Sequence, residues 1–344
     1  MDIKLSERKI KILKAIIDGY ISTGAPIGSR TLSKEEGLPY SSATIRNEMA
    51  DLEELGLLEK THTSSGRVPS NSAYRLYVDQ IMKVDKLSAP EISFISKYFD
   101  RRVDEIHQVL DNAAKAVSDI LGHISVVGAP SWEDAKISRV QLVKIGENRA
   151  IMILISDTGM IKDSLIPIPE DIETQQLEVL SNMITSTLKN GNVANAPKIV
   201  KNMAKNTALQ QKQVLSAVVE ALTNGISQRE IVLGGAKNIL MLPEYKDITK
   251  AKTLISLFDT KDILYRLMNA QAGMKFTVTI GNENSVTNFS DMSIITAQYR
   301  VHDQGIGTFG IIGPTRMNYA KAFSVLDYVG KSLSKILTDF TIKS

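Results

Sequence analysis

Apolar residues near the start of the chain recur at helical spacing in three segments, each bounded by residues that favour helix ends. The first segment lies between Ser6 and Gly24, and Ser is a good N-cap while Gly is a good C-cap. A turn at 26–28 leads to a short second helix over 29–36. The third helix begins after Ser41 or Ser42 and stops at Gly56. Its expected buried stripe is Ile45, Met49, Leu52 and Leu55.

Two short strands are predicted next, over 57–60 and 67–68, around a tip rich in Thr, Ser and Gly. The run 70–72 then caps another helix, whose apolar side is Tyr74, Tyr77, Val78 and Ile81. Residues 86–90, which end in Ala-Pro, are the expected linker to the remainder of the chain.

From residue 90 onward the pattern predicts a mixture of helices and strands. A long amphipathic lead-in helix is expected over 90–122. Alternating apolar positions predict strands at 124–127, 137–145, 149–156 and 160–166, and again at 275–281, 294–301 and 308–312. Helical segments dominate from about 175 to 270, and a last amphipathic helix begins near 315.

Strands on both sides of a helical block favour one α+β domain with a helical insertion over two domains in series. We therefore expect an α+β multidomain protein with three units. They are residues 1–85, residues 90–190 together with 271–344, and an inserted unit over 191–270.

Composition narrows the class of protein. The 344 residues are 43% hydrophobic and 23% charged, as in an ordinary globular protein. The chain contains no Cys, which excludes disulfides, thiolate zinc sites and a Cys nucleophile. No apolar run reaches the length of a membrane span, and no apolar signal core follows the N-terminus, so a cytoplasmic protein is expected.

The order helix, turn, capped helix and small hairpin predicts a winged helix-turn-helix, which places its recognition helix in the DNA major groove. The net charge of +3 is weak evidence for nucleic acid, so the placement of the cations matters more. Those in the elements expected to face DNA are Arg30, Lys34, Arg46, Lys60, Arg67 and Arg75.

Two residues of the recognition helix are suited to reading bases. Arg can pair bidentately with guanine and Asn with adenine, so Arg46 and Asn47 are the expected base contacts. A solvated polar face would be the plainer interpretation on an isolated helix, but the adjoining turn, cap and hairpin favour DNA. Caps and hydroxyls suit phosphate, and Arg67 suits a narrow minor groove. The full set of expected DNA-binding residues is Ser29, Arg30, Ser41, Ser42, Thr44, Arg46, Asn47, His62, Ser64, Ser65 and Arg67.

Signals for catalysis or cofactor binding are weak. Residues 305–310 spell GxGxxG, but a dinucleotide site needs a helix to begin there, and the following Ile-Ile-Gly-Pro indicates a strand and turn. The four His residues are scattered, without the spacing of a metal site. We expect neither cofactor nor metal, and no enzymatic activity.

Three strings indicate a family. They are PIGSRTLS at 26–33, SSATIRNEMADLEELG at 41–56 and HTSSGRVP at 62–69, and GPTRM at 313–317 adds a fourth match near the other end. Together they closely resemble the bacterial heat-inducible transcription repressors of the HrcA family.

The resemblance implies an N-terminal winged helix, a GAF-like domain and a dimerising domain inserted into it. It also implies a homodimer that binds an inverted repeat, the CIRCE operator, and represses chaperone operons. The GroEL chaperonin is implied as the partner that keeps the repressor active. An alternative of a different class is a metabolite-sensing winged-helix regulator, controlled by a ligand in the GAF-like domain.

Overall fold

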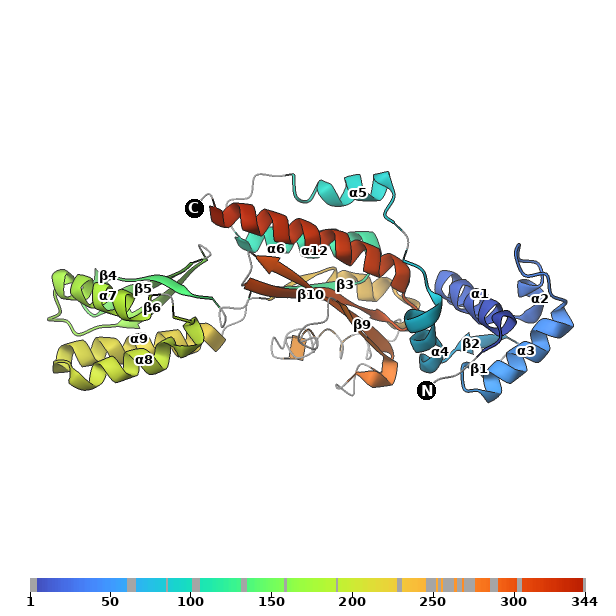
Figure 1. Cartoon of the computed structure of the whole chain (residues 1–344), viewed down its shortest axis with the longest axis horizontal. Helices are drawn as coiled ribbons and strands as arrows, with labels where there is room; N and C mark the ends of the chain where they lie inside the picture. Colours follow the sequence, from blue (N-terminus) through green and yellow to red (C-terminus); the bar gives the residue numbers. More distant parts are fainter. Residues whose placement is uncertain are drawn as a thin grey trace.

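The structure is a computed structural model of the full chain. It describes residues 5–60, 66–84, 86–100, 106–130, 135–157, 160–189, 191–227, 231–245, 276–284, 290–301 and 305–342, with 252, 255, 263, 264 and 268 between them. The described elements form three groups along the long axis of the molecule, which we call the N-terminal, central and three-stranded units (Figure 1).

The N-terminal unit spans residues 5–81 and has the element order expected from the sequence. Its elements are α1 (Glu7–Thr23), α2 (Ser29–Leu32), α3 (Ser42–Glu54), β1 (Leu58–Lys60), β2 (Arg67–Pro69), α4 (Asn71–Leu76) and the π-helical turn η1 (Tyr77–Ile81). β1 and β2 pair as an antiparallel hairpin, with Leu58 opposite Pro69. The four helix starts and the hairpin predicted for this segment are confirmed.

Caps explain where these helices begin and end. The Oγ atoms of Ser6, Ser41 and Ser70 each accept a hydrogen bond from the backbone N–H three residues later, at 3.1–3.3 Å. Gly24 ends α1 in the left-handed conformation with φ 65°, where its N–H donates to the carbonyl of Tyr20. Residues without a side chain tolerate this conformation best, so Gly24 suits its position.

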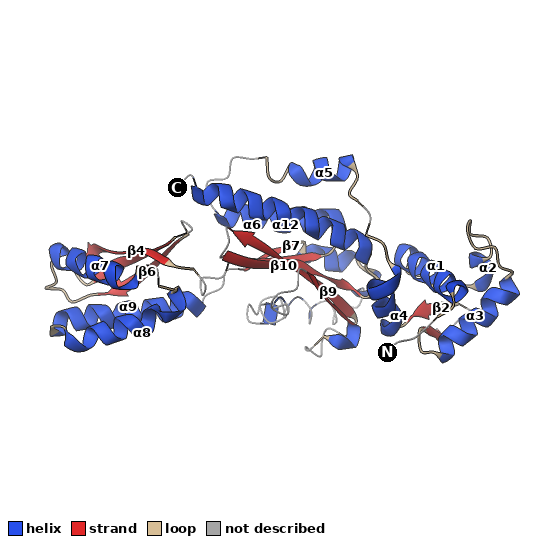
Figure 2. Cartoon of the chain, viewed as in Figure 1, coloured by secondary structure: helices blue, strands red, loops and turns tan. Residues whose placement is uncertain are grey.

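The central unit is built on a five-stranded antiparallel sheet of order β7-β3-β10-β9-β8. The strands are β3 (Ile124–Gly128), β7 (Ile231–Gly234), β8 (Phe276–Ile280), β9 (Met292–Val301) and β10 (Gly305–Pro314). Helices α6 (Ile106–Leu121) and α12 (Tyr319–Ile342) lie together on one face (Figures 1 and 2). Phe309, Val117 and Val329 are fully buried in the shared apolar core.

A smaller apolar cluster covers the other face of this sheet. There Ile124, Ile294 and Ile312 contact Tyr245 and Leu264. Short 3₁₀ turns complete the chain's described elements: η2 (Val193–Asn195), η3 (Ala204–Asn206), η4 (Ala236–Met241), η5 (Pro243–Tyr245) and η6 (Gly281–Glu283).

The single helix expected over 90–122 is wrong, because the structure has two helices. They are α5 (Ala89–Ser96) and α6, and α5 begins with a capping box in which the Ser88 N–H donates to Glu91 at 2.8 Å. The chain turns after Ser96, and the Tyr98 hydroxyl then donates to Asp119 of α6 at 2.5 Å. Both helices have apolar faces, and the chain must reverse its direction between them to pack both on the central unit. Periodicity alone does not reveal this reversal.

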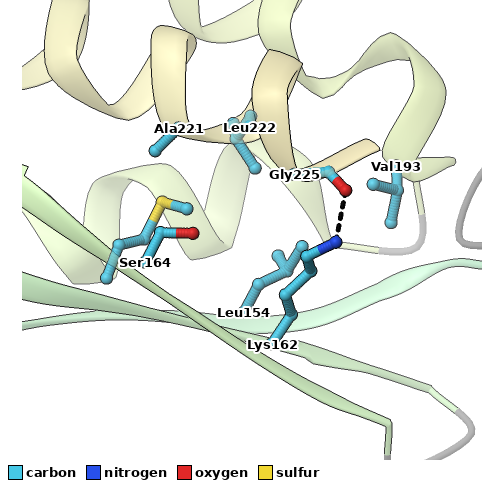
Figure 3. Close-up of a pocket in the computed structure, with 8 residues that line it drawn as sticks. Leu154, Lys162, Ser164, Val193, Ala221, Leu222 and Gly225 are labelled. Carbon is cyan, nitrogen blue, oxygen red and sulfur yellow. Dashed lines mark hydrogen bonds between the residues drawn. The ribbon is translucent and has the colours of Figure 1, made fainter. Parts of the chain in front are cut away.

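The three-stranded unit has its own sheet and its own core. Its elements are β4 (Ile137–Gly146), β5 (Arg149–Ser156), β6 (Ile161–Pro167), α7 (Thr174–Leu188), α8 (Ala196–Met203) and α9 (Leu209–Ser227). The strands form the expected antiparallel meander. Val140, Leu142 and Met152 face the helices within an apolar cluster separate from that of the central unit. A cavity of about 10 Å³, room for about one water, remains beside Lys162, whose ammonium donates to the Gly225 carbonyl (Figure 3).

The structure therefore groups the elements differently from the expected ranges 90–190 with 271–344, and 191–270. Among the described strands, those of 137–167 form one sheet with one another and pack on α7–α9, whereas β7, expected inside the insertion, pairs with β3. Alternation along a strand shows which face is buried but not which sheet supplies its partner. The insertion suggested by the structure is thus the three-stranded unit, residues 135–227.

The GxGxxG segment is a strand, as the sequence predicts. It lies in β10, fully paired with β9, with no helix starting after it until α12. A Cβ on Gly310 would lie 2.1 Å from the carbonyl oxygen of Ile295, and one on Gly307 would lie 2.1 Å from the ring of Tyr299. Close packing between paired strands accounts for these glycines.

Candidate nucleic-acid interface

The turn between α2 and α3 is fixed by small hydroxyl residues. The Oγ atoms of Ser29 and Ser42 are 3.2 Å apart, and Ser29 is buried. Ser41 caps α3, and its Oγ also lies 2.9 Å from the Thr44 hydroxyl. Ser29 and Ser42 therefore hold the two helices together, while Ser41 remains exposed at the helix start.

Arg46 and Asn47 are exposed on the outer face of α3, opposite the buried Ile45, Met49 and Leu52. Neither side chain makes a hydrogen bond or ion pair with another residue that the structure describes. Arg30 on α2 and Lys34 just after it are also exposed. The N-terminal half of α3 thus presents a cation and an amide that are free to meet a ligand.

Glu48 is a site residue that sequence reasoning missed. It lies one position from Asn47 but faces inward, is 4% exposed, and pairs with Arg8 and with Lys9 of α1, whose ammonium is 2.9 Å away. Lys9 also lies 2.6 Å from Asp51, and hydrogen bonds to Asp51 and Glu48 raise the pKa of its ammonium. The signal was available, because an acidic residue at 48 interrupts the apolar stripe.

The hairpin is joined to the C-terminal end of α3 through Glu53. The guanidinium Nε of Arg67 lies 2.7 Å from this carboxylate and the ammonium of Lys60 lies 3.0 Å from it. These hydrogen bonds, that from Lys60 foremost, lower the pKa of Glu53. The Arg67 side chain is 16% exposed, and its backbone also pairs with Ile27 before α2.

The structure therefore assembles the turn and helix face but not the whole predicted set. His62, Ser64 and Ser65 lie outside the described residues. Arg75, expected to face DNA, instead turns to the central unit, where it donates to Glu283 and to the Val278 carbonyl at 2.7 Å. No sequence signal separates Arg75 from the other cations, because its partners lie about 200 residues away.

Other kinds of site find little support among the described residues. They contain no group of three or more His, Cys, Asp or Glu side chains that could hold a metal ion. Within the same residues, no helix combines the length and apolar character required to cross a membrane.

The family model and the curated relatives agree on one family. The family model described as "HrcA protein C terminal domain" matches residues 107–323. A heat-inducible transcription repressor HrcA from Ruminiclostridium cellulolyticum is 39% identical over 337 residues, covering 96% of this chain and 97% of the relative. The protein of the same name from Clostridium tetani is 39% identical over 344 residues, covering 98% and 97%.

A solved structure shares the fold. It is a crystal structure described as a hypothetical protein, with a TM-score of 0.66 and 22% identity, and the match covers 98% of this chain and all of that one. At this identity it supports the mixed helix and strand fold alone, whereas the curated relatives match nearly end to end. The chain belongs to the HrcA family of heat-inducible transcription repressors.

Proposed function

We propose that this chain is a homodimeric DNA-binding repressor of heat-shock operons. The main support for this proposal is the outer face of α3, where Arg46 and Asn47 are exposed. They follow a capped helix start, which the contact between Ser29 and Ser42 holds against α2. In helix-turn-helix proteins this part of the recognition helix contacts base edges. The family name supplies the regulatory role, and such a repressor acts in the cytoplasm, at the nucleoid.

In this proposal α1–α3 and the β1–β2 hairpin form a winged helix-turn-helix, and the central unit is the GAF-like domain. Thr44, Ser41 and the amides at the start of α3 would meet phosphates, as would the hairpin tip. The operator is a CIRCE-type inverted repeat, because two protomers related by a two-fold axis present their α3 helices to two half-sites. The resemblance to the family also supports GroEL as the partner that maintains activity.

The outer face of the three-stranded unit supports dimerisation there. Residues directly opposite one another in the register lie on one face, so Val143, Ile151 and Leu165 line up, as do Ile155 and Ile161. Ile161 and Leu165 are highly exposed for aliphatic side chains, at 64% and 58%, while Ile151 and Ile155 of the middle strand are partly exposed. The helices of the unit cover the other face, and an aliphatic sheet face of this kind is typical of a protein interface.

The dimer surface is tested by Ile161→Asp. We expect the variant to be monomeric by sedimentation at concentrations where the parent chain is a dimer. Val179→Asp is the matched control, since Val179 is equally exposed, at 61%, but lies on α7. Dimers of unchanged stability in Ile161→Asp would exclude this face.

DNA recognition is tested by titrating the purified chain onto labelled duplex with a CIRCE-type inverted repeat, and onto scrambled duplex, at moderate salt. A preference of ~10³ or more is expected, as for specific regulators. Equal binding to both, with and without the chaperonin, would reject the operator.

A metabolite-sensing regulator remains the second candidate. A groove of about 580 Å³ runs between β8, β9 and α12, lined by Arg300, Lys331 and Asp327 among others. Its size suits a small ligand, and the charged side chains among its apolar lining could orient such a ligand. A small molecule that raises the melting temperature of the chain and changes operator affinity would favour this candidate.

A further inference from the structure

Helix α4 belongs to the packing of two units at once. Tyr74 on α4 is 1% exposed, and its ring centroid lies 5.9 Å from that of Tyr319, the first residue of α12. Just beyond α4, the Tyr77 hydroxyl donates to Asp18 of α1 at 2.8 Å. Figure 1 shows α4 between the N-terminal and central units. The apolar core is therefore continuous from α1 to α12 across the boundary between the two units.

A first polar contact crosses this boundary through Arg75. Its guanidinium Nε donates to Glu283 at 2.9 Å, and its Nη2 donates to the backbone carbonyl of Val278 at 2.7 Å. Nearby, Gly281 adopts a φ of 55°, and a Cβ there would overlap the side chain of Asn71, the first residue of α4. The start of α4 thus lies directly against η6 and the edge strand β8.

A second contact comes from the loop between β10 and α12. Arg316 there pairs with Glu244 and donates through Nη1 to the carbonyl of Ile21, in the last turn of α1, at 3.4 Å. The last turn of α1 contains no basic residue of its own. A cation is favourable at the negative end of a helix, and Arg316 provides it from the other unit.

We propose that Arg316 and Arg75 are positioning residues, which fix the orientation of the N-terminal unit on the central unit and so set the separation of the two α3 helices in the dimer. The inference rests on the proposed function for its DNA consequence. Apolar contacts such as Tyr74–Tyr319 are non-directional, whereas the two guanidinium contacts, placed on α1 and α4, resist rotation of one unit on the other.

The orientation matters because a two-fold operator is read only when both α3 helices meet their half-sites at a fixed spacing along the DNA. A unit that could rotate would still bind one half-site. It would lose the advantage of presenting both helices already in place.

The first experiment compares operators with altered half-site spacing. In the double variant Arg316→Gln with Arg75→Gln we expect the preference for the best spacing to fall by about tenfold, through loss of preorganisation, with single half-site affinity unchanged. Lys115→Gln is the matched control, since it removes a cation paired with Asp111 within α6 of the central unit. A spacing profile identical to that of the parent chain would overturn the proposal.

The second experiment needs no DNA. The chain has no Cys, so Glu36→Cys and Lys335→Cys, both at exposed positions, accept spin labels without background. Labelled chain diluted in unlabelled chain should give one narrow distance distribution in the parent and a broad one in the double variant and in each single variant. Narrow, unchanged distributions in the folded single variants would overturn the proposal.

Together the two experiments distinguish a failure of the DNA-binding proposal from a failure of the positioning proposal. If the parent binds the inverted repeat no better than scrambled duplex but the distances broaden in the variants, the DNA-binding proposal fails and the positioning role of the two arginines stands. If the parent is selective and neither the spacing profile nor the distances change, the positioning role fails alone.

Discussion

Arg46→Ala isolates base reading from folding. The side chain is exposed and pairs with no other described residue, so its removal should change the free energy of unfolding by no more than about 0.5 kcal/mol. A bidentate contact from Arg to guanine supplies about 1–3 kcal/mol of discrimination. A dimer makes two such contacts, so the operator preference should fall by about 2–6 kcal/mol, or about 30-fold to 10⁴-fold.

The assay is fluorescence anisotropy on operator and scrambled duplex at one salt concentration, with thermal unfolding measured in parallel. Arg30→Ala is the comparison, because an exposed cation on α2 that contacts phosphate should weaken both duplexes alike. If Arg46→Ala also weakened both duplexes alike, the assignment of Arg46 to a base would be refuted.

Three further changes have defined outcomes. Because the Arg67–Glu53 pair supports the hairpin, Glu53→Gln and Arg67→Ala should lower operator affinity equally and leave the salt dependence of binding unchanged. A salt slope smaller by about one for Arg67→Ala alone would instead make Arg67 a phosphate contact. Gly310→Ala should destabilise the chain by about 1–3 kcal/mol or more in thermal unfolding, while Gly146→Ala, with open space around it, should not. Burial, and secondly the positive charge of Arg316, lower the pKa of the His123 imidazole to about 4. Because the unfolded chain has the ordinary His pKa of about 6.5, this difference contributes fully to stability above about pH 6.5. Stability measured in urea should fall from pH 6.5 towards pH 4, and replacing His123 by Gln should flatten that part of the curve.

Local rules were sufficient for the helix starts of the N-terminal unit, although Leu55, expected in the buried stripe of α3, is 45% exposed and α2 ends at Leu32 rather than at residue 36. Caps at Ser6, Ser41 and Ser70 and the turn glycines are recognised within a few residues of sequence, and each lies where it was expected. The exposure of Arg46 and Asn47 follows from the apolar stripe of α3 in the same way. These predictions needed no information about distant parts of the chain.

Pairing between distant segments could not be obtained in this way. The strands at 137–167 have the alternation of any half-buried sheet, and only the packing of α7–α9 on them shows that they form a separate unit. The chain reversal between α5 and α6 depends similarly on the Tyr98–Asp119 contact and the shared core. Periodicity identifies a buried face, but the element that buries it is decided by the whole fold.

The sequence also does not reveal which cations have partners in distant parts of the chain, and this affects the interpretation of function. By sequence, Arg30, Arg46, Arg67 and Arg75 all lie in elements expected to face DNA. In the structure Arg67 supports the hairpin and Arg75 joins the units, while Arg30 and Arg46 stay exposed. When fewer cations are available to contact DNA phosphates, non-specific electrostatic attraction contributes a smaller share of the free energy of DNA binding. If the two proposals hold, selectivity comes from the bases that α3 contacts and from the fixed spacing of the two α3 helices, and Arg316, on the loop before α12, becomes a determinant of operator choice.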